Sequence, residues 1–260
     1  EIQKMAKDSL QKRKKKYSLK FLNPGQIKLM KKNKVFLALD TSNIKLVKKI
    51  IKQTKIKELE IIPKFGLQFF YSKEGRKFLE KFNKNFFLDL KINDIKQTAL
   101  SAIDSLKDLK KCRYITIHAN GGLEMLRAAK KKAAETNKNL KLLGVTVLTS
   151  LDNKSLKEIG YTKTLDKLVL KQAGLIKKAG LHGVVLSAKE AKIVKKKYKN
   201  LFIVTPGIRL PGDKKNDQVR VVTPYEALNK YKANAIVMGR SLIRGNIKSN
   251  IKKLIDHLNQ

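Results

Sequence analysis

Short apolar runs rich in β-branched residues recur from residue 34 onward, at intervals of about 25 to 35 residues. Between them lie lysine-rich segments with helical periodicity, such as "KEGRKFLEKF" and "GLEMLRAAKKKAAE". Near-continuous apolar strands that alternate with amphipathic helices are typical of a parallel sheet with right-handed crossovers. The eight predicted strands are "VFLALD" (35–40), "LEIIPKFG" (59–66), "FFLDLKI" (86–92), "YITIHA" (114–119), "LLGVTVLT" (142–149), "GVVLS" (183–187), "FIVTPGI" (202–208) and "AIVMGRS" (235–241).

Eight strand–helix units within residues 34–260 predict an α/β fold, the (β/α)8 TIM barrel. A doubly wound open sheet is the alternative, but no glycine-rich dinucleotide fingerprint follows the first strand. Residues 1–33 differ, with few regularly spaced apolar residues, a block of lysines and a break at Pro24–Gly25. We predict that they form a basic, flexible N-terminal extension, disordered or partly helical. An RNA or membrane tether is the functional alternative for this segment.

The charge balance is strongly basic, with a net charge of +39 over 260 residues. Only 8 of the 60 basic residues are arginine, and the lysines are spread over the whole chain. A nucleic-acid reader would more often cluster arginines with aromatic residues for stacking. The lysine, isoleucine and asparagine bias instead fits an AT-rich coding sequence, so no specific nucleic-acid partner is expected. A polyanion-binding role is the alternative.

Cysteine and histidine usage excludes several classes of site. A single cysteine, Cys112, excludes an internal disulfide and a cysteine-rich metal site. The three histidines share no ligand-like spacing, so no zinc site is expected. There is no apolar run near 20 residues and no signal-peptide pattern, which predicts a cytoplasmic protein without a membrane partner.

Polar residues end all eight predicted strands. Active sites of this fold form at the carboxyl ends of the strands, so this pattern predicts an enzyme. The residues in question are Asp40, Lys64, Asp89, Lys91, His118, Thr149, Ser150, Ser187, Pro206, Gly207, Arg209, Gly239 and Arg240.

The stretch "FLDLKINDIKQTA" (87–99) places Asp89, Lys91 and Asp94 within six positions. In a strand, Asp89 and Lys91 point to the same side. A surface ion pair is the simpler interpretation, and a catalytic charge array is the functional one. Pro63, directly before Lys64, lacks the backbone donor that a strand needs, so we expect a bulge there or a later strand start.

From Val35 to Leu254 the sequence resembles the orotidine 5′-phosphate decarboxylase family. Its signature Asp-x-Lys-x-x-Asp-Ile-x-x-Thr is present as Asp89, Lys91, Asp94, Ile95 and Thr98. Supporting blocks in family order are "FLALD", "KFGLQFF", "IHANGGLEM", "GVTVLTSL", "TPGIRLPGDKKNDQVRVVTP" and "VMGRSLI". The resemblance implies decarboxylation of orotidine 5′-monophosphate (OMP) to UMP and CO2, in pyrimidine biosynthesis, without metal or organic cofactor.

The resemblance also implies roles for the charged residues. Lys91 would stabilise negative charge at C6 of the pyrimidine and donate the proton there. Asp89 would lie beside the substrate carboxylate and hold the lysine, and Lys64 and Asp94 would complete an alternating chain of charges. Asp94, Ile95 and Thr98 would reach into the site of a second subunit, which makes the expected enzyme a homodimer with shared active sites.

Substrate-binding roles follow in the same way. Gly239 and Arg240 would bind the phosphate, together with Arg209 and Gln218 from a lid-like loop after the seventh strand. The other expected substrate contacts are Asp40 to the ribose, Thr149 or Ser150 to the pyrimidine edge, and Lys64, Ile95, Thr98 and Pro206. His118 and Cys112 are expected to be structural. Arg220 fits the family pattern, with a structural role as the alternative.

Two alternative functions stay open at the level of sequence. One is a metal-dependent sugar-phosphate decarboxylase or aldolase of the same superfamily, which shares the Asp-x-Lys-x-x-Asp core. The Ile95–Thr98 continuation and the Arg209–Gln218 block favour the nucleotide enzyme. The other is a basic nucleic-acid-binding relic, which the intact charged motif argues against.

Overall fold

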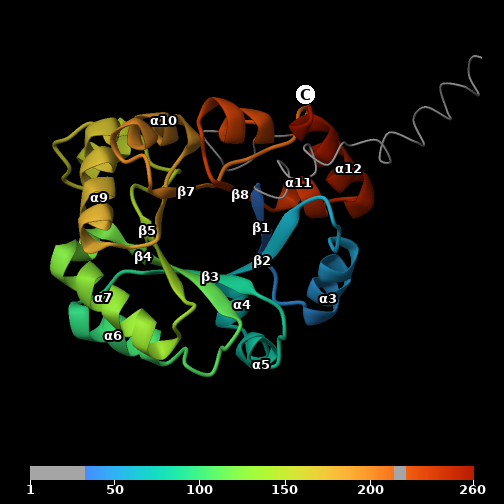
Figure 1. Cartoon of the computed structure of the whole chain (residues 1–260), viewed down its shortest axis with the longest axis horizontal. Helices are drawn as coiled ribbons and strands as arrows, with labels where there is room; N and C mark the ends of the chain where they lie inside the picture. Colours follow the sequence, from blue (N-terminus) through green and yellow to red (C-terminus); the bar gives the residue numbers. More distant parts are fainter. Residues whose placement is uncertain (1–32, 214–220) are drawn as a thin grey trace, which may run out of the picture.

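The computed structural model describes residues 33–213 and 221–260, and they form a closed barrel of eight parallel strands in chain order (Figure 1). β1 pairs with β8 as well as with β2, so the sheet has no open edge. The strands are β1 Lys34–Leu39, β2 Glu60–Gly66, β3 Phe86–Ile92, β4 Cys112–His118, β5 Lys141–Val145, β6 Gly183–Val185, β7 Phe202–Thr205 and β8 Ala235–Met238. The predicted TIM barrel and its eight strands are confirmed.

The helices surround the ring of strands, with α12 beside α3 where the ring closes (Figure 1). Between β2 and β3 there are two short helices in place of the one predicted. Gly75, which starts the second, lies so close to the carbonyl of Phe69 that a Cβ would clash with it. The helices are α3 Ile44–Gln53, α4 Leu67–Phe70, α5 Gly75–Glu80, α6 Lys96–Asp104, α7 Gly122–Thr136, α8 Asn153–Glu158, α9 Leu165–Ala179, α10 Ala188–Lys197, α11 Arg240–Ile243 and α12 Ile247–Leu258, with a 3-10 turn η1 Ala119–Gly121 and a π-helical turn η2 Glu226–Lys230.

Apolar side chains pack in two layers. The larger cluster lies between the strands and the helices, and the smaller one fills the barrel interior with a residue from every strand. Aromatic rings dominate the inner layer, where Phe36 lies 4.8 Å from Phe87 and 5.1 Å from Tyr114, centroid to centroid. The inner residues are Phe36, Ile62, Phe87, Tyr114, Leu143, Val185, Phe202, Val204, Ala235 and Val237. This layer fixes which residues of each strand point inward.

Pro63 corrects one expectation. The strand β2 runs through it, and the register with β1 continues unbroken from Lys34 opposite Glu60 to Leu39 opposite Phe65. Neither a bulge nor a later strand start occurs. The pairing of β2 with β3 begins only at Lys64, so the proline precedes that ladder and does not interrupt it.

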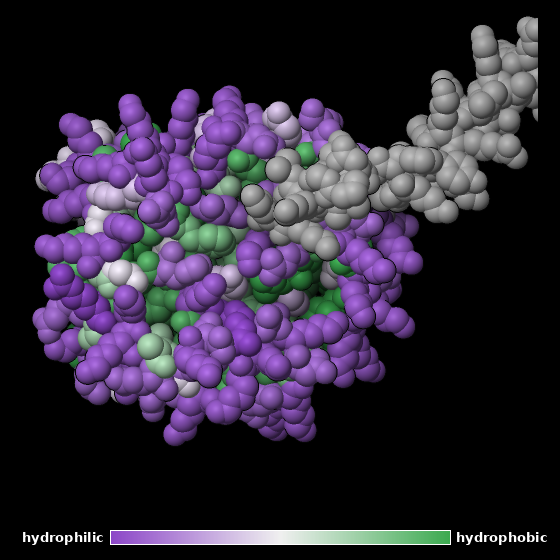
Figure 2. All heavy atoms as spheres, in the orientation of Figure 1, coloured by the Kyte–Doolittle hydropathy of each residue, from purple (hydrophilic) through white to green (hydrophobic). Residues whose placement is uncertain are grey.

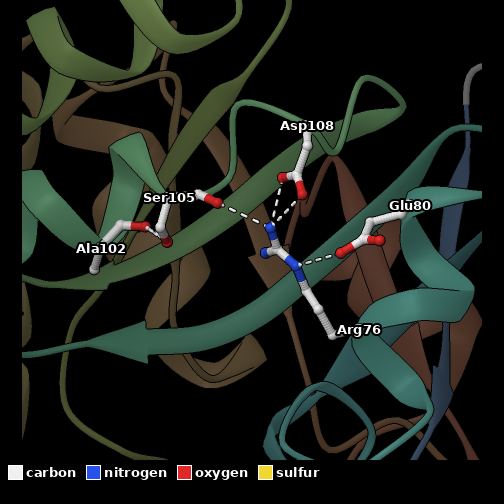
Figure 3. Close-up of polar contacts among 5 residues, drawn as sticks. All are labelled: Arg76, Glu80, Ala102, Ser105 and Asp108. Atoms are coloured by element: carbon white, nitrogen blue, oxygen red, sulfur yellow. Dashed lines mark hydrogen bonds and ion pairs between the residues drawn. The ribbon is translucent and has the colours of Figure 1, made fainter.

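Arg76 of α5 ties the helices of two successive units together (Figure 3). Its guanidinium donates to Glu80 one turn further along the same helix at 3.1 Å and to the carbonyl of Ser105 at 2.9 Å. Both oxygens of Asp108 accept from Nη2, at 2.5 and 2.6 Å. Because Ser105 caps the end of α6, this network anchors the end of α6 that lies away from Asp94.

Hydrophilic side chains cover most of the visible face, with apolar atoms showing mainly between them (Figure 2). This distribution agrees with lysines that lie on the outer faces of the helices. Within the two described ranges, no helix is both long enough and apolar enough to cross a membrane. The predicted N-terminal extension lies outside the described residues except for Asn33.

Candidate active site

Side chains that follow the inner apolar layer, toward the carboxyl ends of the strands, form a polar site. Two positions after Ile62 comes Lys64, and two positions after Phe87 comes Asp89, both on the inward side. Lys91, two positions further along β3, lies at the cavity as well. Together they line a cavity of about 560 Å³ at the carboxyl ends of the strands. Ten of the residues predicted from the sequence line it: Asp40, Lys64, Asp89, Lys91, Thr149, Pro206, Gly207, Arg209, Gly239 and Arg240.

The charges in this cavity alternate. Asp89 Oδ2 lies 2.9 Å from the Lys91 ammonium and 3.1 Å from the Lys64 ammonium. Lys64 Nζ also lies 3.6 Å from Asp40 Oδ1. In space, the side chains of Asp40, Lys64, Asp89 and Lys91 therefore follow one another in this order. Each one carries the opposite charge to the side chain next to it.

Burial differs along this chain of charges. The Lys64 side chain is only 6% exposed, whereas that of Asp40 is 67% exposed. A buried ammonium requires a charged partner, and Asp89 supplies it. Gly66 leaves room for this pairing, since a Cβ there would lie 3.2 Å from Asp40 Oδ1.

The ionisation of Asp89 follows from these contacts. Burial raises the pKa of its carboxyl, but the ammonium groups of Lys64 and Lys91 together outweigh burial, and with the hydroxyl of Thr116 they lower the pKa to about 2. Asp89 is thus a carboxylate at neutral pH. It holds the Lys91 ammonium at the cavity with a charge-assisted hydrogen bond.

Thr116 is a site residue that the sequence analysis missed. It is fully buried, donates to Asp89 Oδ1 at 2.9 Å and accepts from the backbone N–H of Lys91 at 2.8 Å. The inward register could have found it, because it lies between Tyr114 of the inner layer and His118. A threonine in a β-branched run indicates only strand propensity by itself.

His118 follows on the same inward side of β4. Burial lowers the pKa of its imidazole, and the Lys91 ammonium lowers it further, while Asp89 acts in the opposite direction. The side chain is therefore neutral at pH 7. Its Nδ1 is buried without a hydrogen-bond partner among the described residues.

Two arginines lie at the other end of the cavity. Arg240 starts α11 directly after Gly239, which approaches β1 so closely that a Cβ would lie 3.1 Å from Ala38 Cβ. Arg209 is buried, and its guanidinium donates to the carbonyl of Ile208 at 2.9 Å. Both also line an adjoining cavity of about 270 Å³, so the two cavities share a cationic wall.

Four predicted site residues do not line the larger cavity. Asp94, Ile95 and Thr98 are exposed at the start of α6, and Asp94 accepts a hydrogen bond from the N–H of Ile95 at 2.7 Å. Ser150 is exposed beside Thr149. Gln218 and Arg220 lie outside the described residues.

Metal ligands do not gather in the described part of the chain: no group of three or more histidine, cysteine, aspartate or glutamate side chains has the arrangement that holds an ion. Cys112 is buried at the start of β4, and burial raises the pKa of its thiol to about 12. It is a packing residue.

Comparisons with known proteins agree on one family. The family model described as "Orotidine 5'-phosphate decarboxylase / HUMPS family" matches residues 33–251. Among curated relatives, the orotidine 5'-phosphate decarboxylase of Wolbachia sp. subsp. Brugia malayi is 37% identical over 226 residues, which cover 86% of this chain and 97% of that protein. The enzyme of that name from Carboxydothermus hydrogenoformans is 39% identical, over 81% of this chain and 89% of that protein.

A solved structure extends the comparison to three dimensions. The crystal structure of orotidine 5'-phosphate decarboxylase from Lactobacillus acidophilus has a TM-score of 0.72 and 29% sequence identity, and the match covers 87% of this chain and 99% of that one. Family model, curated relatives and fold therefore agree over almost the whole described barrel. The chain belongs to the orotidine 5'-phosphate decarboxylase / HUMPS family.

Proposed function

We propose that this protein decarboxylates OMP to UMP and CO2 without a metal or organic cofactor. The observation that carries the proposal is the pair of ammonium groups, Lys64 and Lys91, held by one half-buried carboxylate inside the cavity. Loss of CO2 from C6 leaves an electron pair on a carbon with no adjacent group to delocalise it. A preorganised cation at that carbon supplies the missing stabilisation.

Lys91 is the proposed acid. As the bond between C6 and the carboxylate breaks, its electron pair stays on C6, where the Lys91 ammonium neutralises the developing charge and donates a proton. Asp89 holds Lys91 at 2.9 Å and would lie beside the departing carboxylate. Lys64 contacts the same oxygen of Asp89 at 3.1 Å, so the carboxylate stays ionised while substrate enters.

Binding energy from the rest of the substrate would position C6. Arg240 and Arg209 are proposed phosphate contacts, because they form the cationic wall of the cavity. Gly239, which also lines the larger cavity, is the third proposed contact. Gln218 is proposed as a further contact from the loop that follows Arg209. Asp40 would bind ribose hydroxyls together with Lys64, and Thr149 or Ser150 would contact the pyrimidine edge beside Pro206.

Shared sites in a homodimer are the second part of the proposal. Asp94, Ile95 and Thr98 are exposed in a single chain, and Ile95 is an apolar side chain with 73% exposure. Leu67 and Tyr71, which follow β2, are exposed apolar residues as well. Such residues near one rim of the barrel favour a partner there, with Asp94 extending the charge chain of the neighbouring site.

Turnover is tested by incubating the purified protein with OMP and EDTA and following the ultraviolet absorbance of the pyrimidine. We expect conversion to UMP that EDTA does not diminish. Activity on OMP that EDTA abolishes would contradict the cofactor-free mechanism. A folded protein with no turnover in either condition would refute the proposal.

Shared sites are tested by mixing two inactive variants, Lys91→Ala and Asp94→Ala. A mixed dimer has one site with both substitutions and one with neither, so subunit exchange restores activity. Mixing two batches of Lys91→Ala alone is the control and restores none. Failure of the mixture, with both variants shown to exchange subunits, would place Asp94 in the site of its own chain or outside catalysis.

A further inference from the structure

Strand β3 is irregular at the residues that carry the charges. Leu88 pairs with Ile115 of β4, and the next paired residue of β3 is Ile92, which lies opposite Ile117. Three residues of β3, 89–91, therefore face the single residue Thr116. This is a bulge that places Asp89 and Lys91 together at the cavity.

The bulge places the backbone of Lys91 in an unfavourable conformation, with φ at +49°. Lys91 and Lys232 are the two non-glycine residues of the described chain with a positive φ. Residues other than glycine rarely adopt this backbone conformation, and it persists only where the surrounding structure stabilises it. Some group must therefore stabilise the backbone directly at the proposed acid.

The hydroxyl of Thr116 has the right position for this. It accepts from the Lys91 backbone N–H at 2.8 Å and donates to Asp89 Oδ1 at 2.9 Å. The same hydroxyl thus joins the strained backbone of one charged residue to the carboxylate of the other. It leaves Asp89 Oδ2 for the ammonium groups of Lys64 and Lys91.

We propose that Thr116 is a positioning residue of the active site: its hydroxyl fixes the bulge of β3 and so sets the distance and orientation between Asp89 and Lys91. It lines neither cavity and touches no reacting atom in this arrangement. Its effect on turnover rests on the proposed function, whereas its effect on Asp89 can be measured without substrate.

Substitution of Thr116 by an isostere separates the effect of its hydroxyl from the effect of its side-chain shape. Thr116→Val keeps the volume and branching of the side chain and removes both hydrogen bonds. We expect kcat to fall by roughly 10- to 100-fold, the factor that corresponds to losing hydrogen bonds that include one to a charged group. Binding of UMP should change by less than about threefold, because the phosphate and ribose contacts stay in place.

A second measurement reports on Asp89 directly. The 13C signal of its carboxyl, followed as the pH is lowered from 7 through its pKa of about 2, should titrate at higher pH in Thr116→Val, since the Thr116 hydroxyl is one of the groups that lower the pKa of Asp89. Lys64 from β2, Lys91 from β3 and His118 from β4 also face this carboxylate, with Asp40 behind Lys64. All four are unchanged in the variant, so a displaced titration reports the lost hydroxyl.

Matched variants complete the test. Thr116→Ser should recover most of kcat and the titration of the original protein, because it restores the hydroxyl. Thr146→Val is the control, since Thr146 is also a buried threonine whose hydroxyl bonds to a neighbouring strand, donating to the Val185 carbonyl at 3.1 Å. It should change neither readout. If Thr116→Val does not fold, Thr116→Ala is the second variant. It removes the same hydroxyl and places no methyl group in its position.

The outcomes are distinct. Unchanged kcat and an unmoved Asp89 titration in Thr116→Val would overturn the inference, as would a serine variant no better than the valine variant. If the unmodified protein does not convert OMP, the proposed function fails. The Asp89 titration would still decide whether Thr116 organises the charges.

Discussion

Replacing Asp89 by asparagine tests the idea that one carboxylate balances two ammonium groups. Its pKa of about 2 in the folded protein lies below the ordinary value of 3.8. Because a tenfold change in a proton equilibrium corresponds to about 1.4 kcal/mol, the charged form of Asp89 contributes about 2 kcal/mol to the stability of the fold at pH 7. Asp89→Asn should lower the free energy of unfolding by about this amount.

The sign of the pH dependence follows from the same values. A carboxyl whose pKa is lowered by folding stabilises the fold above its unfolded pKa, and this contribution is lost as the pH falls through its folded pKa. The difference between the original protein and Asp89→Asn should therefore be nearly constant above about pH 5. It should shrink to about 1 kcal/mol at pH 3, where the unfolded chain is mostly protonated and the folded chain is not.

Urea unfolding followed by circular dichroism at pH 7, 5 and 3 measures this difference. Asp256→Asn is the control, because Asp256 is an exposed carboxylate of α12, on the outer helical layer. Its small effect should not follow this pH dependence. A difference for Asp89→Asn that stays constant down to pH 3, or is near zero at pH 7, would show that the two lysines do not hold Asp89 ionised as described.

Three further predictions concern individual side chains. Lys91→Met should reduce turnover of OMP by at least about 10⁴-fold in a steady-state assay while the barrel stays folded, because it removes the group proposed as both the stabilising cation and the proton donor. Arg240→Ala should weaken UMP binding by roughly 10- to 100-fold in calorimetry but leave uridine binding nearly unchanged, since only UMP carries the phosphate. In Lys91→Met, the pKa of His118 should rise, as measured by NMR of its ring protons, because the repelling ammonium is gone and Asp89 remains.

Each of these has a result that would contradict it. Substantial turnover by Lys91→Met would assign the proton to another group. Equal losses of UMP and uridine affinity in Arg240→Ala would place the phosphate elsewhere in the site. An unchanged His118 titration would mean that burial alone sets its pKa.

The positions of the strands could be predicted from the sequence because each buried strand needs an uninterrupted apolar run, as in "VFLAL" of β1. The meeting of Asp89 and Lys91 was also predicted, from the two-residue period of a regular strand. The structure brings them together differently, through a bulge with Lys91 at a positive φ. The alternation along "FLDLKI" is the same in both cases, so the sequence contains no sign of the bulge.

Contacts between elements that are distant in the chain could not be predicted from the sequence, for a related reason. Thr116 matters because the hydroxyl of β4 lies beside β3, and this depends on the register of two strands that are 25 residues apart. Likewise, Arg76 meets Asp108 only because α5 and the end of α6 are neighbours in the ring. In the second strand–helix unit, two short helices replace one, and the close approach of Gly75 to a carbonyl there is a steric constraint that periodicity does not report.

Closure of the sheet between β1 and β8 has a consequence for how the protein is made. The first strand leaves the ribosome some 200 residues before its partner Ala235–Met238, so the growing chain must wait with β1 unpaired on one side. Gly239 and Arg240 follow immediately after that last strand. The cationic wall of the cavity is therefore completed in the same late step that joins the two ends of the sheet, and a nascent chain that has not closed lacks the proposed phosphate contacts.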